Sequence, residues 1–255
     1  MGHPTPPAWY VISLRPQGGH DALRLAARRH GAGLLALSPW RIQPCDDPAT
    51  RGALEKALAC PLVVFTSPAA VSAAQALASL QTQRGNTWLA VGAGTAGALR
   101  RVGIPATSPH RMDSEGLLAL PALQDIRGID IGFVTAPDGR NLLVPTLQAR
   151  GAQVHRAEVY RREPLTLPPR ALNALAALDR PACLLLSSVG ALERVLAQLP
   201  PAAAARILTA SVVAASARLA EAARAAGFGD VVQADGPRPA QLMKSASTVM
   251  APRIR

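Results

Sequence analysis

The chain has 255 residues, of which 49% are hydrophobic and 17% are charged, and its formal net charge is +11. This composition excludes a disordered chain, and the longest apolar runs fall short of the roughly 20 residues that a membrane span needs. We therefore expect a soluble protein with a full hydrophobic core and no membrane partner.

The positive charge comes almost entirely from arginine, because Lys56 and Lys244 are the only lysines. Two interpretations stay open. Either the arginines form a solvated surface without a binding role, or they meet a polyanion, since guanidinium groups pair their donors with carboxylates and phosphates. Nucleic acid is not expected as the partner, because aromatic residues make up 3% of the chain and no nucleic-acid-binding motif is present.

The cysteines and histidines are scattered. No Cys-x-x-Cys pair occurs and no histidine lies at ligand spacing, so we expect neither a disulfide framework nor a metal. Residues 92–96 hold part of a dinucleotide-binding pattern without its third glycine and distal acidic residue, so NAD is not expected either, and the predicted cofactor content is none. The first seven residues lack the apolar stretch of a secretory signal, which favours the cytoplasm.

A predicted strand at residues 9–14 is followed by a loop that carries Arg15 and by a helix at 22–30. The next segment, 34–42, has extended character and is broken by a proline. We expect the chain to leave one body and enter another here, through a linker near 38–44.

The stretch 62–71 shows the pattern on which the second body is built. An apolar run ends in Thr66 and Ser67 and then resumes with helical composition, which predicts a buried strand, a tight loop and a capped helix. The free backbone N–H groups of such a loop favour an anion. Similar units follow, so the second body is expected to contain helix 53–59, strand 62–65, helix 69–80, strand 87–91, helix 97–102, a short helix from 113, strand 129–134 and helix 142–150.

The pattern returns at 183–192, where Ser188 takes the place of Ser67. Before it, residues 154–164 are predicted to form a second linker strand. The polar tail beyond Gly236 is expected to be frayed or disordered. The remaining expected elements are helix 170–178, strand 183–186, helix 191–199, strand 206–209, helix 216–226 and strand 231–232.

Two strand-helix units of the sequence match each other, and their positions indicate how the chain divides into domains. The unit that ends at Gly151 is the last one in the middle part of the chain, whereas its counterpart, which ends at Gly31, is the first one in the whole chain. The predicted fold class is therefore α/β, with two similar parallel-sheet domains joined by a two-stranded linker and a cleft between them. The expected bounds are 1–37 plus 165–255 for the outer domain, 42–157 for the inserted domain, and 38–41 and 158–164 for the linker strands.

Six short motifs occur in order between Trp9 and Pro237. They are Arg15-Pro16, Phe65-Thr66-Ser67-Pro68-Ala69-Ala70-Val71, Val91-Gly92 with Thr95-Ala96, Ser114-Glu115-Gly116-Leu117-Leu118, Val159-Tyr160-Arg161, and Ala220-Glu221-Ala222-Ala223-Arg224 with Gly227-Phe228. Each is short and built largely of small residues, but the ordered set, with its gaps, resembles the uroporphyrinogen-III synthase family.

The resemblance implies a two-domain enzyme of tetrapyrrole (haem, sirohaem) synthesis that needs no cofactor or metal and is a monomer. Its substrate would be the linear hydroxymethylbilane, which loses its hydroxyl and closes to uroporphyrinogen III, with ring D inverted through a spiro intermediate. That substrate is an octacarboxylate, which gives the arginine excess a partner. The alternative is a two-domain protein that binds a small polyanion without chemistry.

The resemblance also gives roles to individual residues. Tyr160 is the candidate catalytic residue that protonates the leaving hydroxyl, since a phenol is a donor, although packing at the domain junction also accounts for it. Hydroxyl residues at the loops would bind carboxylates or only cap helices, and the arginines would pair with carboxylates or lie on a solvated surface. The candidate substrate-binding residues are Arg15, Ser67, Thr95, Ser114, Arg140, Ser187, Ser188 and Arg218.

Overall fold

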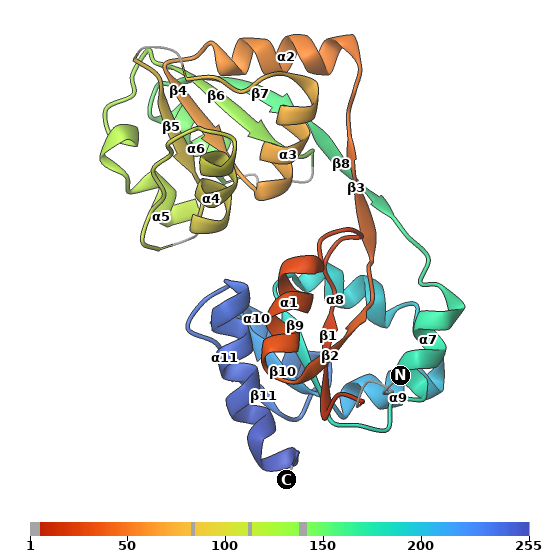
Figure 1. Ribbon diagram of the computed structural model, residues 1–255. Helices are drawn as coiled ribbons and strands as arrows, with labels where there is room; N and C mark the ends of the chain where they lie inside the picture. The colour runs from red at the N-terminus through yellow and green to blue at the C-terminus, as the bar shows by residue number, and fades with distance from the viewer. Residues whose placement is uncertain (1–5, 83–84, 112–113, 138–141, 255) are drawn as a thin grey trace. The chain divides into compact units, whose positions relative to one another are not determined.

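The computed structural model describes residues 6–82, 85–111, 114–137 and 142–254. The chain divides into two compact units (Figure 1): unit 1 consists of Met1–Arg41 with Pro164–Arg255, and unit 2 of Ile42–Glu163. Strands β3 (Trp40–Pro44) and β8 (Tyr160–Pro164) pair in a two-stranded sheet where the chain passes from one unit to the other. Unit 2 is therefore an insertion in unit 1.

Unit 1 is built on a five-stranded parallel sheet in the order β11-β10-β9-β1-β2. Alternate residues of the central strands enter two separate cores: Ile12 and Leu184 contribute to one, Val11 and Cys183 to the other. A sheet buried on both faces explains why these strands are apolar throughout. The strands are β1 (Trp9–Ser13), β2 (Ala32–Ala36), β9 (Ala182–Leu186), β10 (Ser211–Ala214) and β11 (Val231–Gln233).

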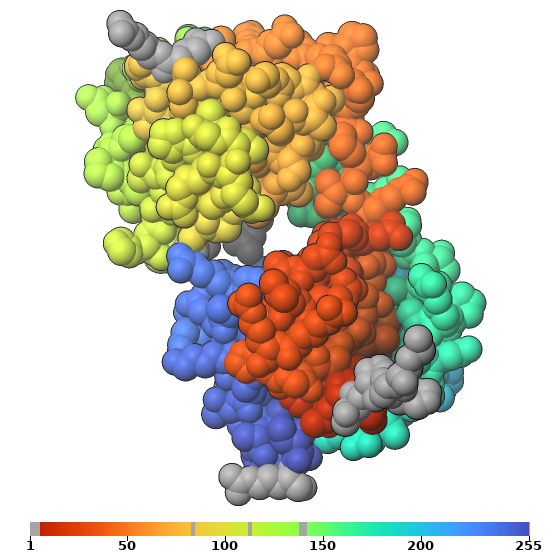
Figure 2. Space-filling view, viewed as in Figure 1, coloured from red at the N-terminus to blue at the C-terminus, as the bar shows by residue number. Residues whose placement is uncertain are grey.

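The helices of unit 1 cover both faces of this sheet. One face packs against α1 (Asp21–Arg29) and α11 (Pro239–Met250), and Figure 2 shows these two helices together on the visible surface. Ser247 Oγ of α11 lies 2.7 Å from Nδ1 of His30, the residue that follows α1. A short 3-10 helix, η2 (Ala251–Arg253), follows α11. The other face packs against α7 (Pro169–Ala176), α8 (Val189–Leu196), α9 (Pro201–Leu208) and α10 (Ala217–Ala225).

Two predictions for unit 1 are wrong. The strand expected at 206–209 is the end of α9 and the turn after it, and the strand lies instead at Ser211–Ala214. Proline at the first helical position and the four alanines after it favour a helix, and the strand preference of the short apolar run that follows is too weak to override this. The tail expected to be disordered forms α11, because Leu242, Met243, Ala246 and Met250 lie on one helical face and are buried.

Unit 2 has a four-stranded parallel sheet in the order β5-β4-β6-β7, formed by β4 (Leu62–Phe65), β5 (Thr87–Ala90), β6 (Asp130–Thr135) and β7 (Gln153–Glu158). One face packs against α2 (Pro48–Leu58), α3 (Pro68–Leu77) and α4 (Ala93–Arg101), and the other against α5 (Ser114–Leu118), the 3-10 helix η1 (Pro121–Leu123) and α6 (Leu143–Ala149). The segment 154–164, expected as one linker strand, is divided: its first part lies in edge strand β7, and only β8 pairs with β3.

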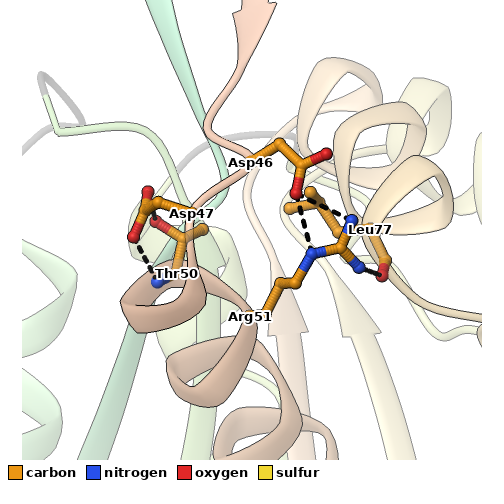
Figure 3. Close-up of polar contacts among 5 residues, drawn as sticks. All are labelled: Asp46, Asp47, Thr50, Arg51 and Leu77. Atoms are coloured by element: carbon orange, nitrogen blue, oxygen red, sulfur yellow. Dashed lines mark hydrogen bonds and ion pairs between the residues drawn. The ribbon is translucent and has the colours of Figure 1, made fainter.

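Polar contacts fix the start of α2 (Figure 3). Asp47 accepts hydrogen bonds from the Thr50 N–H at 2.9 Å and from the Thr50 hydroxyl at 2.7 Å, which caps the helix. Arg51 Nε donates to Asp46 at 2.7 Å, and another of its guanidinium nitrogens donates to the carbonyl oxygen of Leu77 at the end of α3. These contacts tie the first helix of unit 2 to its neighbour.

Within the described ranges, no helix is both long and apolar enough to cross a lipid bilayer.

Candidate functional site

Hydroxyl groups gather at the carboxyl edge of the unit 2 sheet. Thr66 follows β4 and Thr135 ends β6, and because these strands are parallel neighbours, the two side chains meet with 3.0 Å between their Oγ1 atoms. Tyr160 begins β8, which only Val159 separates from the end of β7, at the same edge. Ligands of open parallel sheets bind at this edge.

Ser67 connects a helix start to the phenol. Its backbone is extended (φ −157°, ψ 158°), and its Oγ accepts a hydrogen bond from the Ala70 N–H at 3.0 Å, which caps α3. The same Oγ lies 3.0 Å from the hydroxyl oxygen of Tyr160, and either group can donate. The Tyr160 side chain packs in the unit 2 core and is 2% exposed. When Ser67 donates, the phenol proton stays available for another acceptor.

A second helix begins beside Ser67 and α3. A Cβ placed on Gly94, in the first turn of α4, would lie 3.7 Å from Pro68 Cγ in the first turn of α3. Gly92 occupies the N-cap of α4 and has no side chain that could accept a hydrogen bond from the first N–H groups of the helix. Thr95 is buried, and its hydroxyl has no hydrogen-bond partner in the described part of the chain. The two helix starts thus offer hydroxyl and N–H donors close together.

The other candidates of unit 2 are placed less centrally. Ser114 is buried at the first position of α5, on the opposite face of the sheet from α3 and α4. Its neighbour Glu115 pairs with Arg111 at 3.1 Å on the surface. Arg140 lies outside the described residues.

Four candidates of unit 1 lie at the carboxyl edge of its own sheet. Arg15 follows β1, Ser187 and Ser188 follow β9, and Arg218 lies in the first turn of α10 after β10; these three strands are neighbours in the sheet. Ser188 Oγ accepts from the Ala191 N–H at 3.3 Å and so caps α8. Ser187 and Arg218 are exposed to solvent, whereas Arg15 is half-buried.

Burial lowers the pKa of the Arg15 guanidinium below its ordinary value. No ion pair to Arg15 occurs among the residues that the structure describes. A guanidinium that is partly removed from water without a counter-charge is available for a carboxylate of a ligand.

The sequence did not indicate a functional place for His20. It is buried and contacts two serine hydroxyls at the same edge of the unit 1 sheet. Metal-binding histidines can be recognised from their spacing in the sequence. A histidine that connects two strand ends has no characteristic spacing and so cannot be recognised in this way. Its position immediately after the loop of Arg15 was the available signal.

Comparisons with known proteins agree with the resemblance in sequence. The family model described as "Uroporphyrinogen-III synthase HemD" matches residues 21–244. The curated uroporphyrinogen-III synthase of Salmonella typhimurium strain LT2 is 43% identical over 98 residues, which are 35% of this chain and 40% of that protein. The matched part therefore spans less than half the length of this relative.

Solved structures share the fold. A mutant uroporphyrinogen III synthase from Thermus thermophilus has a TM-score of 0.62 at 20% identity, with 95% of this chain and 99% of that chain covered. The uroporphyrinogen-III synthetase of Helicobacter pylori 26695 has a TM-score of 0.60 at 14% identity, with 94% and 99% covered. These likenesses establish a two-domain α/β fold of the expected class. Because the family model covers most of its length, this chain belongs to the uroporphyrinogen-III synthase family.

Proposed function

We propose that this protein acts as a uroporphyrinogen-III synthase, which closes linear hydroxymethylbilane to uroporphyrinogen III with inversion of ring D. The observation that carries the proposal is the match of the family model to residues 21–244. A fold alone does not imply a function. The hydroxyl and arginine residues at the carboxyl edges of the sheets give the proposal its chemical support, because they suit a substrate with many carboxylates.

Tyr160 is the proposed proton donor. As the carbon–oxygen bond of the hydroxymethyl group breaks, the phenol gives its proton to the departing hydroxyl, which leaves as water. The electron-rich pyrrole supplies the electrons that expel the hydroxyl, so a weak acid is sufficient. Ring closure through the spiro intermediate later releases one proton, which restores the phenol. The net change is the loss of one water molecule.

Ser67 supports this role. Its hydroxyl accepts from the Ala70 N–H and lies 3.0 Å from the phenol oxygen. In the proposed arrangement Ser67 is the donor of this pair, which leaves the Tyr160 proton free for the substrate. It also stabilises the transient phenolate. Thr95 and the N–H groups at the start of α4 are proposed to bind substrate carboxylates, as are Arg15, Ser114, Arg140, Ser187, Ser188 and Arg218.

Binding must do more than hold the substrate. A free bilane closes without inversion, so the enzyme has to orient the terminal rings and suppress the direct closure. Several fixed carboxylate contacts accomplish this without any group that reacts covalently. We also propose, on the family resemblance, that the protein works as a monomer in the cytoplasm, which light scattering and cell fractionation would test.

A coupled assay tests the function. Hydroxymethylbilane is generated in place, the protein is added, and the oxidised products are separated into the I and III isomers. We expect a clear excess of the III isomer over the protein-free control. The isomer ratio of spontaneous closure, obtained with protein that circular dichroism shows to be folded, would contradict the proposal and leave a protein that only binds polyanions.

The Tyr160→Phe variant tests the proton donor. It removes the hydroxyl and keeps the buried ring, so the fold should persist while cyclisation slows by about 10²-fold or more, the contribution typical of a positioned acid. An unchanged rate would assign Tyr160 to packing alone.

A further inference from the structure

A buried histidine joins the ends of two neighbouring strands in unit 1. His20, immediately before α1, is 5% exposed. Its Nδ1 lies 2.9 Å from Ser13 Oγ, and its Nε2 lies 2.8 Å from Ser38 Oγ. Ser13 ends β1, and Ser38 follows β2, which is the parallel neighbour of β1. The imidazole therefore spans two strand ends at the edge where parallel sheets bind ligands.

Burial and the nearby positive charges favour the neutral form of the imidazole. Burial lowers the pKa of His20 below its ordinary value, the positive charges of Arg24 and Arg15 lower it further, and Asp21 opposes them. In a neutral imidazole one ring nitrogen donates and the other accepts. Because a hydroxyl can do either, both serine contacts are satisfied together, and the ring is held in one orientation.

The two arginines beside His20 differ in their counter-charges. Arg24 Nη1 forms an ion pair with Asp21 at 2.7 Å. Arg15, by contrast, has neither an ion pair nor a side-chain hydrogen bond to any described residue, although its guanidinium is half-buried. Partial removal of an unpaired cation from water is unfavourable. The position of Arg15 is therefore suited to an anion that the protein itself does not supply.

The loop that carries Arg15 is fixed at both ends. Ser13 precedes it and His20 follows it, and the imidazole joins these two ends through the Ser13 hydroxyl. Between them, the Gln17 N–H donates to the carbonyl oxygen of Trp40 at 2.9 Å. Both ring nitrogens of His20 are occupied by hydroxyls, so the histidine is placed to support the loop and not to contact a ligand.

We propose that His20 is a positioning residue: by clamping Ser13 and Ser38 it fixes the loop so that Arg15 meets a carboxylate of the bound tetrapyrrole. This inference rests on the proposed function for the identity of the carboxylate. It assigns to His20 a role that operates entirely through Arg15. Removal of His20 should therefore matter only while Arg15 is present.

A double-mutant cycle tests this dependence. The probe is uroporphyrin III, an oxidised octacarboxylate form of the product, titrated by its fluorescence at fixed ionic strength against the wild type, His20→Ala, Arg15→Ala and the double variant. Each single change should weaken binding by about tenfold or more, as expected for one charge-assisted hydrogen bond. The double variant should bind no more weakly than Arg15→Ala. The proposal would be overturned if the loss of affinity in the double variant equalled the product of the two single losses, or if His20→Ala left the Kd unchanged.

Two further variants keep the test decisive. Ser247→Ala removes the contact between a serine and His30 at the other end of α1 and should leave the Kd unchanged. If His20→Ala does not fold, Ser38→Ala replaces it, since it removes one clamp contact and keeps the buried ring. It should weaken binding in the wild type and have no effect in the Arg15→Ala background. Equal weakening in both backgrounds would overturn the proposal.

Kinetics separate this inference from the proposed function. In the coupled assay, His20→Ala should raise KM for hydroxymethylbilane much more than it lowers kcat, because Tyr160 is unaltered. A purely structural defect would reduce the amount of active enzyme and leave KM unchanged. If the wild type yields no excess of the III isomer, the proposed function fails, while the uroporphyrin titration still decides whether His20 acts through Arg15.

Discussion

Ser67 and Ser188 cap equivalent helices in the two units, and each Oγ accepts from the N–H three residues later, at 3.0 Å for Ser67 and 3.3 Å for Ser188. Within the described chain, Ser67 alone of the two also contacts a phenol, that of Tyr160. The same local signal therefore serves helix capping in unit 1 and, in unit 2, both capping and the orientation of the proposed acid.

Replacement of each serine by alanine separates these roles. Loss of the cap should destabilise either variant by about 1 kcal/mol. Ser67→Ala should also lower kcat, because the Tyr160 hydroxyl loses its donor, whereas Ser188→Ala should act on KM. Urea unfolding and the rate of formation of the III isomer measure the two effects. Equal kcat values for the two variants would mean that Ser67 takes no part in the reaction.

A second prediction concerns the contact between β6 and α2. A Cβ added at Gly132 would lie 1.9 Å from the carbonyl oxygen of Ala57, at the end of α2, so the backbone of one element must move. Gly132→Ala should destabilise unit 2 by about 1–3 kcal/mol or more. The matched control is Gly97→Ala in α4, where a Cβ meets nothing within 4 Å and should add about 0.5–1 kcal/mol of stability. Thermal unfolding of the two variants should thus shift in opposite directions.

The cap of α2 gives a pH dependence. The N–H and hydroxyl of Thr50 lower the pKa of Asp47 below its ordinary value of 3.8. The folded state therefore favours the carboxylate, and its stabilising effect is complete above that value and is lost as pH falls through the lower folded pKa. Asp47→Asn should keep the cap and lose this pH dependence, since asparagine caps helices equally well. Urea midpoints from about pH 7 to pH 3 should show that the wild type loses stability relative to Asp47→Asn as the pH falls; a constant difference would contradict the assignment.

The terminal helix α11 provides a fourth prediction. Met243 is fully buried against the sheet of unit 1, whereas its neighbour Lys244 is exposed. Met243→Ala should destabilise unit 1 by about 2–5 kcal/mol, and Lys244→Ala by less than about 0.5 kcal/mol. Chemical unfolding measures both. Similar values would mean that α11 contributes little to the core.

Local signals were sufficient where strand, cap and helix follow one another directly. The strand at Leu62–Phe65 and the helix capped by Ser67 are confirmed, because an apolar run, a serine and a proline at the first helical position all favour the same structure. The ends of the helices expected at 97–102 and 216–226 are also confirmed: Gly103 and Gly227 follow them with φ of 82° and 95°, which other residues rarely adopt.

Signals failed where tertiary packing decides. The residues of α11 look polar in sequence, and their apolar stripe gains meaning only against the sheet. The strand misplaced at 206–209 competed with an alanine-rich helix. The contacts of His20 join the last residue of β1 to Ser38, which follows β2, and could not be inferred without the pairing of these strands. The roles given to the individual site residues stay predictions, with Arg140 outside the described chain.

Strand β1 of unit 1 pairs with two neighbours that are synthesised at very different times. β1 pairs with β2, which follows it closely, and with β9, which is synthesised only after the whole of unit 2. At a typical rate of translation this delay is on the order of ten seconds, long compared with the folding of a small domain. Unit 2, a continuous stretch, is free to fold during that interval, while β1 has an unpaired edge. We therefore expect nascent unit 1, with its unpaired strand edge, to depend on chaperones more than unit 2 does.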